Sequence, residues 1–129
     1  MKKLITIAAI ATALVSPLSY ADINSDLENI CTIVKNNDKG ELRKKMRAIN
    51  KEYNVRLGDI YAGVSCGGSS LIRYSMQNNA ADVGEYMIKK MSKKDLAAEE
   101  KDGVALQQWA ETNGFMATTI GQALVERLG

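Results

Sequence analysis

The stretch SSLIRYSMQNNAADVGEYMIKKM, residues 69–91, reads as two short amphipathic helices joined by a turn. Apolar side chains recur at helical spacing on both sides of the polar pair Asn78-Asn79, and this pair favours a turn. Ser69 or Ser70 can cap the first helix. The stretch therefore predicts a helical hairpin, and a single hairpin exposes an apolar face that other elements must cover.

Residues 25–49 show the same pattern upstream. A capping box starts a helix at Ser25, polar residues then break it, and Asp38 can cap a second helix. When residues 25–49 are aligned with residues 69–91, the apolar and turn positions agree at a constant offset of forty-one, and Asn37 is matched with Asn78. We therefore expect a second hairpin here.

A third, fainter copy follows, because Leu106 and Trp109 lie thirty-five residues after Leu71 and Tyr74. Between the first two hairpins, residues 50–68 lose the helical period and contain several glycines, so we expect a long ordered loop with a short helical turn. Together these elements predict an all-α fold of two to three stacked helical hairpins.

The first twenty-one residues have the pattern of a secretory signal peptide: two lysines, an apolar run too short to span a bilayer, and Ala21 before the predicted cleavage site. Removing residues 1–21 discards two of the 17 basic residues and none of the 15 acidic ones, so the formal net charge becomes zero. We expect residues 22–129 to form a single helical domain that is periplasmic or secreted. A neutral chain gives no support for a nucleic-acid partner, and no later apolar stretch has the length of a transmembrane segment.

Cys31 and Cys66 are the only cysteines, and an even count in an exported chain predicts one disulfide between them. Closing a loop of this length contributes roughly 3 to 4 kcal/mol by the chain-entropy estimate. The alternative is a catalytic redox pair, but such pairs usually lie two residues apart rather than thirty-five.

Residues 69–88, with their turn at Asn78-Asn79, resemble the two helices of an ankyrin repeat. Ser70 stands where the ankyrin consensus has Pro, and Asn79 stands where it has Gly, so the resemblance implies an ankyrin-like hairpin geometry. Residues 66–71 are also similar to a stretch in small exported bacterial proteins of uncharacterised function. That second resemblance implies no activity.

One catalytic motif occurs, because residues 63–67 satisfy the Gly-x-Ser-x-Gly pattern of esterases around Ser65. Its chemistry needs a general base, and the chain contains no histidine. Metal binding would depend on carboxylates, but the acidic group from Asp95 to Asp102 contains Lys101 and fits no EF-hand loop, so we interpret it as a solvated helical surface. We expect no enzyme activity, no cofactor and no metal site.

Residues 35–56 have an excess of basic residues, which favours this segment as a partner surface. Tyrosine and arginine are enriched at binding hot spots, and two tyrosines are expected in the long loop. The candidate interaction surface consists of Lys44, Arg47, Tyr53, Arg56 and Tyr61. A second basic group at a predicted helix end either pairs with the acidic residues after it or contacts anionic lipid or polysaccharide. It consists of Lys89, Lys90, Lys93 and Lys94.

These features favour an exported, non-catalytic protein-binding module of the bacterial envelope, because helical hairpins and a neutral charge occur here without catalytic chemistry. A specific version of this hypothesis is an inhibitor or immunity-type protein. The alternative is a binder of a small ligand or of an anionic envelope surface, either lipid or polysaccharide.

Overall fold

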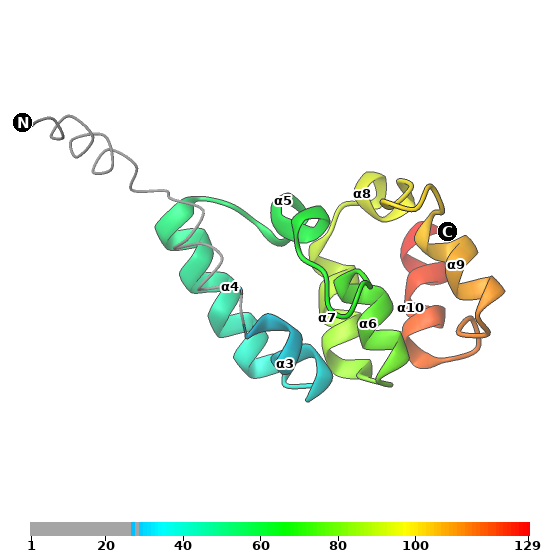
Figure 1. Ribbon diagram of the computed structural model, residues 1–129, viewed down its shortest axis with the longest axis horizontal. Coiled ribbons are helices and arrows are strands. Elements are labelled where there is room, and N and C mark those ends of the chain that lie inside the picture. The colour runs from blue at the N-terminus through cyan, green and yellow to red at the C-terminus, as the bar shows by residue number, and fades with distance from the viewer. Residues whose placement is uncertain (1–26, 28) are drawn as a thin grey trace, which may run out of the picture.

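The computed structural model describes residue 27 and residues 29–129, and this part of the chain is helical, with two isolated β-bridges and no β-strand (Figure 1). The all-α prediction is confirmed. No helix within these residues has the length and apolar character needed to cross a membrane. The predicted signal peptide lies outside the described residues. The helices are α3 (Ile30–Lys35), α4 (Lys39–Tyr53), α5 (Leu57–Ile60), the 3-10 helix η1 (Tyr61–Gly63), α6 (Leu71–Gln77), α7 (Ala81–Lys90), α8 (Lys93–Ala97), α9 (Leu106–Thr112) and α10 (Thr119–Leu128).

Helical hairpins follow one another along the described chain as the pairs α3–α4, α6–α7 and α9–α10. Helix α3 contacts α6, α4 contacts α7, and α7 contacts α10. Figure 1 shows the hairpins in this order across the molecule, from cyan through green to red. Neighbouring hairpins therefore cover the apolar faces that each would expose alone.

The turns of these hairpins share one backbone geometry. Asn37, Asn79 and Gly114 have positive φ angles of 56°, 53° and 79°. A residue in this conformation ends a helix by directing the next N–H back toward it. That N–H donates to the carbonyl five residues earlier, at 3.1, 2.8 and 2.8 Å, in the pairs Asp38 to Ile33, Ala80 to Ser75 and Phe115 to Ala110.

The spacing of the turns corrects the predicted offset of forty-one between the first two hairpins. Asn37 and Asn79 are forty-two residues apart, whereas the helices before them start forty-one apart, at Ile30 and Leu71. The reason is that α3 has 6 residues and α6 has 7. The predicted offset of thirty-five to the third hairpin is confirmed, because it separates Asn79 from Gly114.

The segment between the first two hairpins contains α5 and η1, as the predicted helical turn suggested. The Arg56 N–H donates to Oδ2 of Asp59 at 2.8 Å and so starts α5. Helix α8 begins where Oγ of Ser92 accepts the N–H of Asp95 at 3.0 Å. Helices α5 and α8 are both short, so their stability depends on a local cap and on their contacts with the hairpins.

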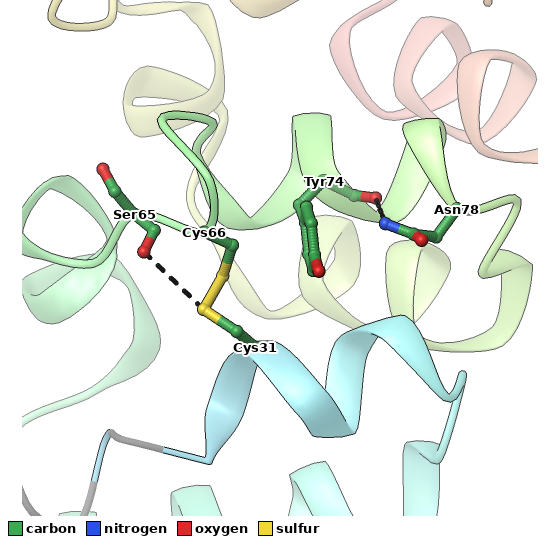
Figure 2. The surroundings of a disulfide bond; sticks show 5 residues. All are labelled: Cys31, Ser65, Cys66, Tyr74 and Asn78. Atoms are coloured by element: carbon green, nitrogen blue, oxygen red, sulfur yellow. Dashed lines mark hydrogen bonds between the residues drawn. A yellow bond between two sulfur atoms is a disulfide. The ribbon is translucent and has the colours of Figure 1, made fainter.

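A disulfide joins α3 to the loop before α6, and Figure 2 shows its surroundings. The Sγ atoms of Cys31 and Cys66 are 2.01 Å apart, which confirms the predicted pairing. Cys66 and Ser69 exchange two backbone hydrogen bonds, at 2.7 and 3.0 Å, across a turn in which Gly67 and Gly68 have positive φ. This turn leads directly into α6, so the disulfide holds the start of α6 beside α3.

The core lies where the hairpins meet. Gly84 of α7 permits a close approach of two other helices, because a Cβ there would lie 2.6 Å from Cδ1 of Ile120 on α10 and 2.9 Å from Oγ of Ser75 on α6. Arg73 is a charged residue within this core, with only 8 % of its surface exposed. The largest fully buried side chains are Ile30, Leu42, Ile49, Leu71, Ile72, Met87, Ile88, Leu106, Ile120 and Leu124, with Val34 and Val83.

Candidate functional site

The residues of the predicted interaction surface do not form one surface. Lys44 and Arg47 are exposed on α4, and Arg56 is exposed just before α5. Tyr53 and Tyr61 are 9 % and 8 % exposed and belong to the core. The expected location of both tyrosines in a loop is corrected, because Tyr53 is the last residue of α4 and Tyr61 is the first of η1.

One side of α4 carries a row of exposed basic residues. Lys39, Arg43, Arg47 and Lys51 recur every four residues, with Lys44 next to Arg43. We define these five residues as the basic face. None of them forms an ion pair with another described residue. Because residues four apart on a helix are neighbours, the row places like charges side by side.

Tyr86 of α7 lies next to the basic face. The guanidinium carbon of Arg43 is 5.9 Å from the centre of the Tyr86 ring, and Nζ of Lys90 is 5.7 Å from it. Both cations are within the range of cation–π attraction. An aromatic ring thus accompanies the basic residues where α4 meets α7.

The four lysines of the second basic group are all exposed. Lys89 and Lys90 occupy the last turn of α7, where the helix dipole favours cations, as predicted. Lys93 and Lys94 belong instead to the first turn of α8. The expected pairing with acidic residues 95–102 is not observed, since no ion pair joins the two groups within the described residues.

A charged cluster around the buried Arg73 connects α6 to the segment after α8. Nε of Arg73 is 2.8 Å from Oε1 of Glu100, and Nη1 is 2.7 Å from Oδ2 of Asp102. Nη2 donates to Oδ1 of Asp102 and to the Val104 carbonyl, both at 3.1 Å. The guanidinium carbon is also 5.0 Å from the centre of the Trp109 ring.

The pKa values of this cluster reflect mutual stabilisation of charge. Burial acts to lower the pKa of Arg73, but the hydrogen bonds to Asp102 and the charge of Glu100 raise it above the usual value. The hydrogen bonds from Arg73 in turn lower the pKa of Asp102. Arg73 and Asp102 therefore each favour the charged form of the other.

Tyr61 joins the cluster from η1. Its hydroxyl oxygen lies 2.7 Å from Oε2 of Glu100 and 2.8 Å from Oγ of Ser70. Because a carboxylate can only accept, the phenol donates to Glu100 and Ser70 donates to the phenol. Burial, and then the charge of Glu100, raise the pKa of Tyr61. The phenol is thus held protonated as a hydrogen-bond donor.

These polar groups form part of the wall of a cavity of about 410 Å³, which we name the Tyr61 cavity. It lies between α5 with η1 on one side and α8 with the residues after it on the other. Its volume is within the range of small-molecule sites. Within the described residues, no three His, Cys, Asp or Glu side chains are placed to hold a metal ion. The apolar part of the wall comes from Ala62, Val64, Met91 and Ala98.

The segment that contains the first two hairpins matches a known protein family. Residues 30–98, from the start of α3 to the residue after α8, match the model of a family described as proteins of unknown function, DUF3718. The chain belongs to the DUF3718 family. A comparison with curated proteins found no match, and a comparison with solved structures found none. The DUF3718 segment includes Tyr61 and Arg73, whereas Glu100 and Asp102 follow it.

The charged cluster of this DUF3718 protein was not predicted. The interpretation of residues 95–102 as solvated surface is wrong for Glu100, whose side chain is 13 % exposed. One signal in the sequence pointed to the cluster, because Arg73 follows the apolar pair Leu71-Ile72 on a short helix that must be buried. A buried arginine requires an anionic partner, but nothing local indicates which one.

The esterase-like motif has a different setting in this DUF3718 protein from the one its chemistry uses. Ser65 is exposed in the loop between η1 and α6, not on a turn from a strand to a helix. The neighbouring sulfur of Cys66 is bonded in the disulfide and is no thiolate.

Proposed function

We propose that this DUF3718 protein is an exported, non-catalytic module that binds an acidic protein partner through its basic face. The observation that carries the proposal is a row of exposed basic residues on α4, none of which pairs with another described residue. The leader pattern in residues 1–21 supports export. The disulfide also supports it, because disulfides persist in oxidising compartments.

The spacing of the basic face introduces charge repulsion within α4. Like charges four residues apart destabilise an isolated helix by about 0.2 to 0.5 kcal/mol per pair. The row contains such pairs from Lys39 to Arg43, from Arg43 to Arg47 and from Arg47 to Lys51. An acidic surface would relieve this repulsion and would guide the encounter by electrostatic attraction. Relief of this repulsion would thus favour binding of an acidic partner to the row.

The side chains around the row favour a protein over a membrane. Arginine and tyrosine are the residue types enriched at protein binding hot spots, and the row holds Arg47 and also Arg43, which lies next to Tyr86. Helices that bind a membrane surface also insert large apolar side chains. Among the described residues, the exposed large apolar side chain is Val125, which lies on α10.

A second candidate function is contact with anionic lipid or polysaccharide through the lysines of α7 and α8. The exposure of all four, Lys89, Lys90, Lys93 and Lys94, favours it. Such a surface would act mainly through charge, so its binding would weaken strongly with added salt.

Affinity purification from the envelope fraction at physiological salt tests the first proposal. We expect one acidic protein to be recovered in stoichiometric amount with the wild type. The double variant Arg43→Glu/Arg47→Glu should lose it, while the matched control Lys93→Glu/Lys94→Glu should retain it. Equal recovery with both variants would reject the basic face. Salt-sensitive binding to anionic vesicles or polysaccharide, with no protein recovered, would favour the second candidate.

A further inference from the structure

Arg73, the buried cation in the wall of the Tyr61 cavity, is already neutralised from within the protein. Arg73 pairs with Glu100 and Asp102 and donates to the Val104 carbonyl. Tyr61 uses its one hydroxyl proton for Glu100. The donors of Arg73 and Tyr61 are therefore engaged, and an anionic ligand at Arg73 would have to displace internal carboxylates.

Two further carboxylates line the cavity and remain available. Asp95 and Glu99 are exposed, and their carboxylates have no hydrogen bond or ion pair to another described residue. Around the whole cavity, four carboxylates face only two cationic side chains, Arg73 and Lys101. The wall thus has an excess of negative charge, and its unpaired carboxylates lie on the side formed by α8.

Apolar side chains complete the wall. Val64 and Met91 are buried residues that border the cavity, and the small side chains of Ala62 and Ala98 leave room beside them. A pocket with an apolar wall and a few placed polar groups is typical of small-molecule sites. Here, within the described residues, the charged groups that remain unpaired are the carboxylates of Asp95 and Glu99 and the single cation Lys101, so the available negative charge exceeds the positive charge and favours a cationic ligand.

We infer that the Tyr61 cavity binds a small organic cation, an amine or amidine attached to an apolar group. The cationic group pairs with Asp95 and Glu99, and its hydrogen-bond donors meet acceptors. The apolar group packs against Val64 and Met91. This site is separate from the basic face on α4, so it goes beyond the proposed function and does not depend on it.

Binding of three probes of similar shape tests the inference: benzylammonium, the neutral benzyl alcohol and the anionic benzoate. Isothermal titration at low salt should show binding of benzylammonium, at least about tenfold tighter than that of either analogue, since about 1.4 kcal/mol of electrostatic preference gives this factor. The double variant Asp95→Asn/Glu99→Gln should weaken benzylammonium binding by a similar factor. The variant Ala98→Trp should abolish it by filling the cavity.

The matched control is Glu111→Gln/Glu126→Gln, which removes two exposed carboxylates outside the cavity wall. It should bind benzylammonium as the wild type does, and thermal melting should show that every variant is folded. Equal binding of the neutral or anionic analogue would overturn the charge argument. Benzylammonium binding that survives Ala98→Trp would place the ligand elsewhere, and no binding at millimolar concentration would also reject the inference.

Discussion

The phenol oxygen of Tyr61 lies 2.7 Å from Oε2 of Glu100 and joins two segments that are 39 residues apart in the sequence. Glu100 in turn pairs with Arg73, so η1, α6 and the segment after α8 meet at one carboxylate. The same three segments enclose the Tyr61 cavity. The hydrogen bond therefore ties together two of the segments that line that cavity.

Ionisation of Tyr61 should be suppressed in the folded protein. Burial and the charge of Glu100 raise its pKa above the ordinary 10.0, so as the pH rises past 10.0 the unfolded chain loses a proton that the folded chain keeps. Stability should therefore fall with rising pH in this range. Phenolate absorbance measures the effect. Compared with the wild type, Tyr61→Phe should show one fewer ionising tyrosine in the denatured protein and the same number in the native protein. Loss of one from the native titration would contradict the assignment.

Replacing Arg73 by leucine should lower the free energy of unfolding by roughly 3 kcal/mol, because Glu100 would remain largely buried without its cation. Asp102→Asn should cost less, since the Asp102 side chain is 48 % exposed. Urea unfolding of both variants at neutral pH compares these losses. Equal losses would contradict the inferred dominance of the Arg73–Glu100 pair.

Acid should remove the contribution of Asp102. Its folded pKa is lowered from 3.8 by Arg73, so the stabilisation is present above pH 3.8 and is lost as the pH falls through the lowered value. The difference in melting temperature between the wild type and Asp102→Asn should therefore shrink below pH 3.8. A difference that stays constant down to the acid transition would show that the pair does not stabilise the fold.

Gly84→Ala should destabilise the protein by about 1 to 3 kcal/mol, because the added methyl group would overpack the contact with Ile120 and Ser75. Alanine is intrinsically the better helix former, so a loss of stability isolates the steric effect. Gly63→Ala is the control, since a Cβ there has no atom within 4 Å. Equal melting temperatures for the two variants would refute the close approach of α7 and α10.

Asn37→Ala should cost about 1 to 2 kcal/mol for two separate reasons. Oδ1 of Asn37 accepts the N–H of Val83 at 3.1 Å and caps α7 from the neighbouring hairpin. Asn37 also has a positive φ of 56°, which alanine adopts poorly. Asn37→Gly restores the backbone freedom alone and should recover part of the loss in thermal melts. Full recovery would mean that the cap contributes nothing.

Much of the fold follows from local patterns in the sequence. Helical period and turn chemistry act over a few residues, so the hairpin at residues 69–91 and its copies are visible before any tertiary contact is known. The pairing of Cys31 with Cys66 was also predictable, because a chain with two cysteines has one possible internal disulfide. The turn offset was wrong by one residue, since helix length varies without a sharp local signal.

The sequence by itself thus determined the helical class, the turns and the disulfide of this DUF3718 protein. Only the tertiary structure placed Arg73 against Glu100 and Asp102, and buried Tyr53 and Tyr61. These contacts join residues that are far apart in the chain, and they depend on how α6 and α8 are positioned in the fold. Polar contacts of this kind have no periodicity along the sequence, whereas apolar faces repeat with every helical turn.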